Sequence, residues 1–419
     1  MDRKDVTLIV ILLAVLGFLV RAGFIYFAKS YENPSTYEYG EIAANIMSGR
    51  GFSRVNEFST HLEPTSSHAP LYPFLLSLLS AGSGRTFGFP GVQLLQAILS
   101  VLTVFFIYGI CRRLYDRTTG VLAAMGLAFY PPLIYYTLKF TPVMLFVFLL
   151  SISLYLIIAA NGNVIKTVAA GVFVGLTVLC DPVGIALIPA LIVCTLLYRR
   201  LRWHTIAIIL LVSCAVLIPW TVRNFRIHRR IVVVTTQYAK NLWIGNNPRA
   251  TGTDYYRSVH GQHSDFTLMT QTLPRETKIV LGTMSEIEQA DFFLQETWRF
   301  VCRHPQHFIR LLLQKTFYYW WRAPSSITAS PDARRYGLWH TLVYAPILLF
   351  GCIGGYLTVI KRRSADTLLI VLTVFFISCI YIIAHVGLAR YRLPIETCLI
   401  PLAAYAVHEA WRWYRHNHA

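Results

Sequence analysis

The chain has 419 residues, of which 55% are hydrophobic and only 14% are Asp, Glu, Lys or Arg. A water-soluble domain could not bury so much apolar surface, so the composition excludes an ordinary soluble protein and indicates an integral membrane protein. In such a protein a net charge of +18 first reports membrane topology and phosphate contacts, and nucleic acid is not an expected partner.

Ten apolar stretches are predicted to be transmembrane helices, because each approaches the ~20 residues that cross a bilayer core. They cover residues 6–28, 91–112, 118–137, 142–160, 165–180, 183–198, 205–220, 338–360, 366–386 and 394–411. The first is too long for the core of a cleaved signal peptide. The pair 165–180 and 183–198 is short, and a re-entrant pair is the alternative.

Basic connections predict the orientation. "MDRK", "CRRLYDR", "NGNVIK", "YRRLRWH", "KRRSAD" and "WRWYRHNHA" are short and carry Lys or Arg, so they and both termini are expected in the cytoplasm. Two long segments, residues 29–90 and 221–337, then lie on the external side.

The first external segment begins with a predicted helix through "EYGEIAANIM", which the glycines of "SGRGF" end. An apolar stretch, "FLLSLLSAGSG", follows and is too short to span comfortably, so it is expected at the membrane interface.

The second external segment contains two predicted helices. The first starts at a capping box, Ser285 with Glu288, and ends at His304 and Pro305. The second, "QHFIRLLLQKTFYYWW", places Arg310 and Lys315 among apolar residues, a pattern typical of a helix on the membrane surface.

The fold class predicted from these elements is an all-α polytopic membrane protein. It has about ten transmembrane helices, external interfacial helices and a mixed α/β external loop domain. Three parts are expected: a membrane module over residues 1–220 with the first external loop 29–90, an external domain over 221–337, and C-terminal helices over 338–419.

Polar groups in the first external loop are the first candidates for chemistry. Glu38 and Glu41 are three residues apart and share one face of the predicted helix, although an amphipathic helix facing water explains them too. In "HAPLYP", His68 is a candidate ligand for a metal or a phosphate, and a capping or packing role is the alternative.

Basic residues at the external ends of spans are the second group. "PWTVRNFRIHRR" contains Arg223 at the external end of a span, where positive charge is not expected from topology. Binding of an anionic headgroup would explain it, and a collar of basic side chains at the membrane interface is the alternative. Arg390 and Arg392 in "HVGLARYRLPIE" are candidates to hold a lipid phosphate, and Lys139 in "YYTLKFTP" could join them.

Two further polar features have simpler explanations beside the functional ones. Asn241, Asn246 and Asn247 in "NLWIGNNPRATG" offer amide groups suited to sugar hydroxyls, yet turn formation also explains them. Asp181 in "LCDPVG" is expected to cap the following helix rather than to act in catalysis.

Several motifs in order resemble the GT-C superfamily of polyprenyl-phosphate-dependent glycosyltransferases. They are "EIAANIMSGRGFS", "HAPLYPFLLSLL", "QLLQAILSVLTVFFIYGICRRLYDRTTGVLAAMGLAFYPPLIYY", "AAGVFVGLTVL", "PWTVRNFRIHRRIVVV", "NLWIGNNPRATG" and "RYRLP". The chain is most similar to bacterial proteins related to protein O-mannosyltransferases and to the aminoarabinose transferase of lipid A. The resemblance implies a GT-C-like fold and a polyprenyl-phosphate-linked sugar as donor.

The resemblance also implies a carboxylate in the first external loop as general base. Where the family usually has an aspartate, about eight residues before Ala43, this chain has Ser35, which is not basic at neutral pH. Glu38 is the nearest acid, with Glu41 or Glu63 as alternatives. A second departure is Thr141 with Pro142, where relatives often carry a glutamate.

The leading hypothesis is an inverting glycosyltransferase that transfers a hexosyl or pentosyl group. Glu38 would be the base, Glu41 or His68 would orient the acceptor or a metal, and a cationic group would hold the donor phosphate. The sugar or acceptor would contact a set of polar side chains. The phosphate set is Arg390, Arg392, Arg223 and Lys139, and the sugar or acceptor set is Tyr39, His68, Asn241, Asn246 and Asn247.

No cofactor is certain, and a divalent metal remains open because no ligand spacing compels one. The expected place is a bacterial inner membrane, with the active loops on the periplasmic or external side and a protein, lipid or glycan acceptor. The first alternative is an inactive relative that binds lipid-linked sugar or assembles with a partner. The second is a transporter or flippase, which the absence of an internal repeat disfavours.

Overall fold

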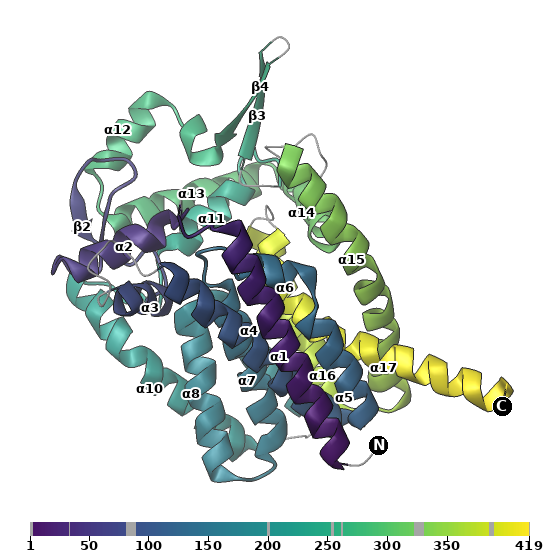
Figure 1. The fold of residues 1–419 in the computed structure, drawn as a ribbon. Coiled ribbons are helices and arrows are strands. Elements are labelled where there is room, and N and C mark those ends of the chain that lie inside the picture. The colour runs from purple at the N-terminus through teal and green to yellow at the C-terminus, as the bar shows by residue number, and fades with distance from the viewer. Residues whose placement is uncertain are drawn as a thin grey trace.

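The computed structural model describes residues 3–32, 34–80, 89–198, 202–252, 255–260, 263–321, 331–384 and 389–418. It is a helical bundle with a polar layer of short helices and two hairpins at one end (Figure 1). The bundle helices are α1 (Arg3–Ala28), α4 (Phe89–Leu114), α5 (Arg117–Ala128), α6 (Pro131–Tyr136), α7 (Val143–Ala160), α8 (Val164–Cys180), α9 (Leu187–Tyr198), α10 (Trp203–His228), α15 (Pro331–Tyr356), α16 (Ala365–Ala384) and α17 (Leu393–His418).

Helices lie at all ten predicted stretches, but the prediction of ten spans is not established. Within the described residues, six helices are long and apolar enough to cross a membrane. They are Asp5–Ala28, Pro90–Leu114, Val143–Ala160, Trp203–His228, Thr341–Lys361 and Ala365–Ala384. Two shorter apolar helices cover Val164–Cys180 and Pro182–Tyr198, the pair for which a re-entrant arrangement was the alternative.

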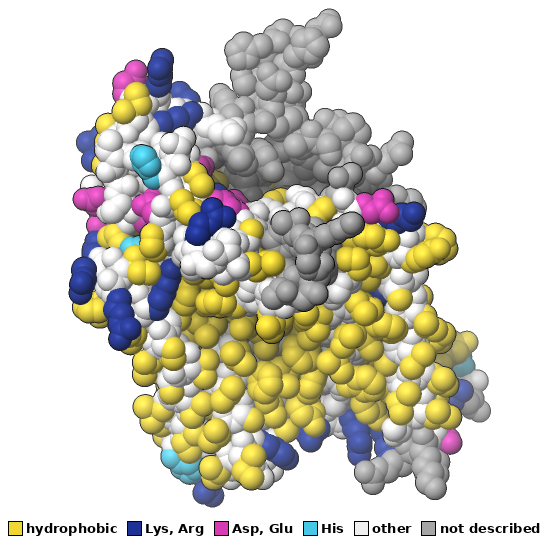
Figure 2. Space-filling view, turned by 60° about the vertical axis from the view of Figure 1, so that its left-hand side comes forward, with side chains coloured by type: hydrophobic (Ala, Val, Ile, Leu, Met, Phe, Trp, Pro, Cys, Tyr) yellow, Lys and Arg dark blue, Asp and Glu magenta, His cyan; other side chains and the backbone are white. Residues whose placement is uncertain are grey.

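The apolar surface forms a broad band around the bundle. Figure 2 shows this band on one face, with Lys and Arg side chains gathered below it and both acidic and basic side chains above it. Exposed Leu, Ile, Phe and Val side chains occur along α1, α4 and α10. Large exposed apolar areas of this kind are what lipid would solvate.

The predicted span at residues 118–137 is interrupted in the structure. Helix α5 ends at Ala128 and α6 begins at Pro131. The fully buried Arg21 of α1 donates to the carbonyl oxygen of Ala128 at 2.7 Å and to Ser100 Oγ at 3.0 Å. An arginine inside the bundle therefore satisfies backbone groups that the broken helix leaves open.

The polar layer corresponds to the segments that the sequence predicts to be external, and it is called the external layer below. Its first part contains α2 (Tyr37–Met47), the hairpin of β1 (Ser53–Val55) and β2 (Leu62–Pro64), and α3 (Leu71–Ser80). The predicted helix and its glycine stop are confirmed, since Gly49 and Gly51 have φ angles of 77° and 70°. Strand β1 pairs antiparallel with β2, with Arg54 opposite Glu63.

The second part contains α11 (Gln237–Gly245), the hairpin of β3 (Tyr255–His260) and β4 (His263–Leu268), α12 (Arg275–Thr283), α13 (Glu286–Arg303) and α14 (Pro305–Trp320). The capping box of Ser285 and Glu288 is present, as predicted. Helices α11, α12 and α13 share a small core of Ala239, Trp243, Leu281 and Phe293. Whether this segment is a separate α/β domain stays a prediction, as does the division of the chain into three parts.

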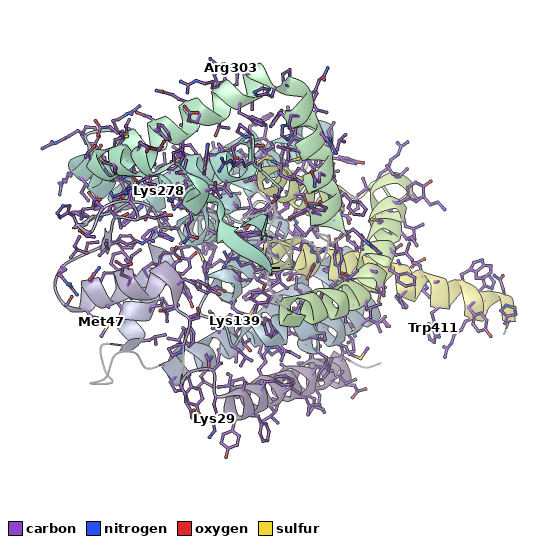
Figure 3. All side chains as sticks on the ribbon, turned by 90° about the horizontal axis from the view of Figure 1, so that it is seen from above. Lys29, Met47, Lys139, Lys278, Arg303 and Trp411 are labelled. Atoms are coloured by element: carbon purple, nitrogen blue, oxygen red, sulfur yellow. The ribbon has the colours of Figure 1, made fainter. Side chains whose placement is uncertain are left out.

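Seen from above the external layer, Met47, Lys278 and Arg303 spread over α2, α12 and α13, and Lys139 lies nearer the middle (Figure 3). Helix α14 differs from the expectation of a basic surface helix in one respect. Lys315 is fully buried, because α14 packs against α16 and turns this side chain inward.

Candidate functional site

Two carboxylates on α2 face one arginine of the neighbouring hairpin. Arg54 Nη2 lies 3.7 Å from Glu38 Oε1, and Arg54 Nε lies 3.5 Å from Glu41 Oε2. The glycine turn at residues 49–51 reverses the chain after α2, so that β1 returns alongside the helix. Glu41 also accepts a hydrogen bond from the Val55 amide at 2.7 Å, which ties the helix to the strand.

His68 stands beside Glu38 in a cluster of aromatic rings. Its imidazole meets the Tyr39 ring edge-on at 5.2 Å, and Tyr39 meets Tyr72 in the same way at 5.4 Å. Ser67 Oγ lies 2.9 Å from His68 Nδ1. Burial lowers the pKa of His68 to about 3, although the Glu38 charge opposes this, so the ring is neutral at pH 7.

Asp181 and Arg390 reach the same region from the bundle. Asp181 accepts from the Val183 amide at 3.0 Å and caps the short 3₁₀ helix Pro182–Ala186, which confirms the predicted cap. Burial raises the pKa of Asp181 to about 6, against the lowering effect of that hydrogen bond and of the Arg390 charge. Burial likewise raises the pKa of Tyr39, and Arg390 again opposes it. Asp181, Tyr39 and Arg390 are therefore electrostatic neighbours.

Arg390 lies in the 3₁₀ turn Ala389–Tyr391, just before α17. Its Nη2 donates to the Tyr391 hydroxyl at 3.1 Å, and its guanidinium is 5.1 Å from that ring. The side chain is half-buried at the external end of the bundle. Lys139, also external, has its ammonium 4.9 Å from the Tyr135 ring centre.

Arg223 and Arg392 make contacts of a different kind. Arg223 donates to the carbonyl oxygens of Thr65 at 2.6 Å and Phe52 at 2.7 Å, and so fastens the first external loop to α10. Arg392 is buried, donates to the Trp321 carbonyl at 2.5 Å and pairs with Glu396 at 3.6 Å. Both guanidinium groups hold the protein's own atoms.

The predicted asparagines are likewise engaged within the fold. Asn246 donates to the carbonyls of Leu242 and Ile383, and its side-chain oxygen accepts from Lys315 at 2.8 Å. Asn247 donates to the Trp243 carbonyl and accepts from the Arg249 amide. Turn formation and helix ends therefore account for these two amides. Asn241 accepts from Gln237 at 3.2 Å.

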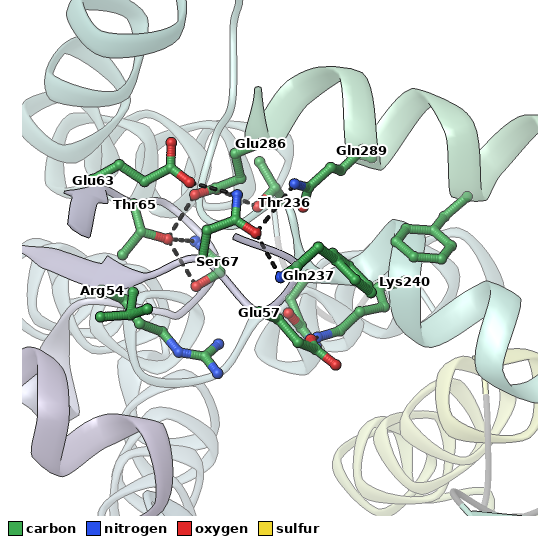
Figure 4. A pocket seen from close by; sticks show the side chains of 15 residues that line it. Arg54, Glu57, Glu63, Thr65, Ser67, Thr236, Gln237, Lys240, Glu286 and Gln289 are labelled. Carbon is green, nitrogen blue, oxygen red and sulfur yellow. Dashed lines mark hydrogen bonds and ion pairs between the residues drawn. The ribbon is translucent and has the colours of Figure 1, made fainter. Parts of the chain in front are cut away.

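A polar pocket opens between the β1–β2 hairpin and helices α11 and α13 (Figure 4). Lys240 and Glu57 form an ion pair of 2.6 Å on its wall. Glu286 closes one side, accepting from Thr65 Oγ1 at 2.6 Å and from Thr236 Oγ1 at 2.5 Å. Arg54 lines this pocket and also forms the ion pair with Glu38 of α2.

The remaining sequence candidates lie around this site. Ser35 is exposed in the segment before α2, and Glu63 lines the pocket and accepts from Asn56 at 2.5 Å. Thr141 is buried, and its hydroxyl has no hydrogen-bond partner in the part of the chain that the structure describes. Sequence reasoning missed Arg54 altogether. The signal was present, because a glycine turn directly after a helix returns the next residues alongside that helix.

A metal site of ordinary composition does not fit this arrangement. Across the described ranges, no three His, Cys, Asp or Glu side chains converge as metal ligands. Glu38 and Glu41 instead face the Arg54 guanidinium.

Comparison with known proteins gives one family match. Residues 67–222 match the family described as dolichyl-phosphate-mannose-protein mannosyltransferase. This segment runs from Ser67 in the external loop to Val222 near the end of α10. No curated protein sequence matches the chain significantly.

Solved structures resemble most of the chain in fold. The Archaeoglobus fulgidus oligosaccharyltransferase tethered with an acceptor peptide has a TM-score of 0.58 at 15% identity, covering 99% of this chain and 51% of that one. The same organism's oligosaccharyltransferase AglB with an inhibitory peptide and a dolichol-phosphate has a TM-score of 0.51 at 15% identity, covering 97% and 51%. ArnT from Cupriavidus metallidurans in the apo state has 0.52 at 14% identity, covering 96% and 61%. The chain thus spans about half the length of the archaeal proteins.

Proposed function

We propose that this chain, whose motifs and fold relate it to the GT-C superfamily of glycosyltransferases, transfers a sugar from a polyprenyl-phosphate donor to a hydroxyl acceptor at the external membrane surface. The resemblance predicted from the sequence motifs is confirmed for the fold. The observation that carries the proposal is the convergence of Glu38, His68, Asp181 and Arg390 at one end of an apolar bundle.

Glu38 is proposed as the general base. It lies in the first turn of α2, where the helix dipole favours a carboxylate. Burial raises its pKa, but His68, the helix backbone, Arg54 and Lys240 together lower it below the ordinary value. A carboxyl group whose pKa lies below its ordinary value is ionised at pH 7, so Glu38 can accept a proton.

Arg390 is proposed to hold the donor phosphate. It is half-buried at the end of the bundle that carries the polar layer, and its charge acts on Asp181 and Tyr39. The neighbouring structure of AglB contains a dolichol-phosphate, which supports a lipid of this class as donor. Lys139 at the same end would add positive charge for the headgroup.

The chemistry needs few groups, because the leaving group is already a phosphate. The acceptor oxygen attacks the anomeric carbon while its proton passes to Glu38. The bond from that carbon to the phosphate oxygen breaks, and the electron pair leaves with the phosphate, whose charge Arg390 opposes. Attack opposite the leaving group inverts the anomeric centre. The sugar would be a hexose or a pentose.

The polar pocket beside Arg54 is proposed as the entry for the acceptor. It adjoins Glu38 through Arg54, and its amide and hydroxyl side chains suit a polar acceptor. Basic residues such as Arg112 and Arg113 lie at the opposite end of the bundle. This distribution supports a cytoplasmic location for that end and an external location for the site. The membrane is proposed to be a bacterial inner membrane, with the site on its periplasmic side.

A second candidate is a relative without catalytic activity that binds lipid-linked sugar. Ser35 favours it, because the family's usual carboxylate is missing there. The retained Arg390 and the Glu38 and Glu41 pair fit both functions.

The test begins with mass spectrometry of lipids that co-purify with the wild type, Arg390→Ala and the control Arg230→Ala. Arg230 is external and pairs with Asp291, outside the site. A polyprenyl phosphate or its sugar adduct should accompany the wild type and the control, and should be depleted from Arg390→Ala. The proposal fails if the wild type carries no such lipid and added polyprenyl phosphate neither binds nor stabilises it.

The same assay separates an enzyme from a binding protein. Sugar adduct bound to the protein is followed by mass spectrometry after addition of a cell-envelope fraction as the acceptor source. The wild type should consume it, and Glu38→Gln should retain it, with turnover lower by about 10²–10⁴-fold. Retention by both proteins would instead favour the non-catalytic relative.

A further inference from the structure

One cation of the protein itself stands between the two carboxylates of α2. Arg54 extends from β1 and is mostly buried, with 17% of its side chain exposed. It approaches Glu38 through Nη2 and Glu41 through Nε. One guanidinium thus faces the proposed base and the carboxylate one turn later on the same helix.

The backbone around Arg54 is fixed by contacts that do not use its side chain. Asn45 donates to the Ser53 carbonyl at 2.8 Å, and the Val55 amide donates to Glu41 at 2.7 Å. Arg223 donates to the Phe52 carbonyl at 2.7 Å. Strand β1 is therefore held next to α2 on both sides of Arg54, whatever side chain that position carries.

The guanidinium itself is not locked in place. Its distances of 3.7 and 3.5 Å to the carboxylates are ion-pair distances, longer than a charge-assisted hydrogen bond of about 2.7–2.9 Å. Arg54 Nε is buried and, among the residues that the structure describes, has no hydrogen-bond partner.

A divalent cation would compete with this arrangement. Mg²⁺ takes about six oxygen ligands and is commonly held by one or two carboxylates with waters and phosphate oxygens, so the feature that opposes it here is the guanidinium already placed at both carboxylates. Within the described part of the chain, no third His, Cys, Asp or Glu completes a ligand cluster around them. The fixed positive charge of Arg54 at ion-pair distance would also repel a second cation.

We propose that Arg54 is a positioning residue, whose guanidinium occupies the place between Glu38 and Glu41 where a divalent cation would otherwise orient the catalytic carboxylate. This rests on the proposed function, in which Glu38 is the base. The structure thereby compensates for Ser35: a glutamate three residues later, in the first turn of α2, is held by an arginine from the next strand. Activity then depends on Arg54 and not on added metal.

The electrostatic consequence concerns the protonation of Glu38. The charged or titratable groups that face it are Arg54 from β1, His68 from the loop before α3, Lys240 from α11 and Tyr39 from α2 itself. Removing the Arg54 charge takes away one of the groups that lower the Glu38 pKa. The base then becomes protonated at a higher pH, so the acidic limb of the rate profile moves upward in pH.

The experiment compares Arg54→Gln, Arg54→Lys and the control Arg50→Gln in the sugar-adduct assay, with and without a chelator. Arg50 is exposed in the turn just before β1, and its side chain donates to Ser48 Oγ at 2.9 Å, away from Glu38 and Glu41. Each variant is first checked for retention of the donor lipid and for its melting temperature, which should equal those of the control.

The expected result has three parts. The chelator leaves the wild-type rate unchanged. Arg54→Gln lowers turnover by about 10²-fold and moves the acidic limb to higher pH, and Arg54→Lys restores the limb in part because it restores the charge. The control behaves as the wild type.

Two results would overturn this inference and leave the proposed function intact. In the first, Arg54→Gln keeps the wild-type rate and pH profile while Glu38→Gln is inactive. In the second, the chelator inactivates the wild type and a divalent metal restores its activity. A Glu38→Gln variant with full turnover would overturn the proposed base, and the role of Arg54 with it. The two failures are therefore distinguishable.

Discussion

At the scale of single residues, the structure separates two arginines that the sequence could not tell apart. Arg390 and Arg392 are two positions apart and both were expected to bind phosphate. Arg392 pairs with the fully buried Glu396, which also accepts from the Tyr130 hydroxyl at 2.8 Å. Arg390 remains half-buried near Asp181 and Tyr39. Arg392 therefore stabilises the fold, and Arg390 faces the proposed site.

Substitution of each arginine should therefore give opposite results. Arg392→Ala is expected to lower the free energy of unfolding by about 3–5 kcal/mol, because it removes the positive charge that pairs with the buried Glu396 carboxylate. Arg390→Ala should keep the wild-type melting temperature and lose the donor lipid. Thermal unfolding in detergent and lipid mass spectrometry measure the two effects. A stable Arg392→Ala protein that has lost its lipid would reverse the assignment.

At the scale of elements, α13 reaches back to the first external loop through its first residue. Glu286 accepts from the Ser66 amide at 3.0 Å and from the hydroxyls of Thr65 and Thr236. The capping box at Ser285 and Glu288 fixes where α13 starts and so where this carboxylate is placed. One side chain thus joins the loop of His68 to α11.

Glu286→Ala should loosen this junction. The three donors lose a charged acceptor, so we expect a loss of about 2–4 kcal/mol of local stability. Hydrogen exchange of residues 53–68 should increase, while exchange in the bundle helices stays as in the wild type. Glu296→Ala, farther along the same helix, is the matched control. Unchanged protection of the loop would show that Glu286 is not its anchor.

At the scale of the whole molecule, Lys315 connects the external layer to the bundle. Its ammonium, carried on α14, donates to Asn246 Oδ1 at 2.8 Å and to the Ile383 carbonyl at 3.1 Å. These acceptors lie at the ends of α11 and α16. Because α16 ends there, its last carbonyls are open to such a donor. Lys315 was expected on the membrane surface, but it is buried and links α14 to the ends of α11 and α16.

The tie should make stability depend on pH. Burial lowers the pKa of Lys315 to about 7, from an unfolded value of about 10.4. Between these values the unfolded chain binds more protons, so the stability contributed by this site rises with pH. Lys315→Met should flatten that rise and cost about 1–3 kcal/mol for the hydrogen bonds lost, above all the one to Asn246 Oδ1. Melting temperatures at pH 6.5, 8 and 9.5 measure both, with Lys278→Met as control; equal slopes would contradict the prediction.

Local features of the molecule followed from sequence. Apolar runs predicted the bundle helices, the glycines at 49 and 51 predicted the end of α2, and the capping box predicted the start of α13. Asp181 capped the turn that follows it, as expected. Each of these depends on neighbours within a few residues along the chain. The motif order that indicated the GT-C fold extends over most of the chain, but it too is read from the sequence alone.

The roles of individual polar side chains depended on partners far away in the chain. Arg223 meets Thr65 across 158 positions, Arg21 meets Ala128 across 107, and Lys315 meets Asn246 across 69. Hydropathy and capping patterns carry no information about such pairs. An arginine that donates to a backbone carbonyl and one that binds a phosphate ligand look the same in the sequence. The sequence by itself determined the membrane class, the helices and the side on which polar groups gather. Only the tertiary structure decided which charged side chains bind the protein's own atoms, because burial and distance arise from packing. It also decided that Arg54 lies between Glu38 and Glu41.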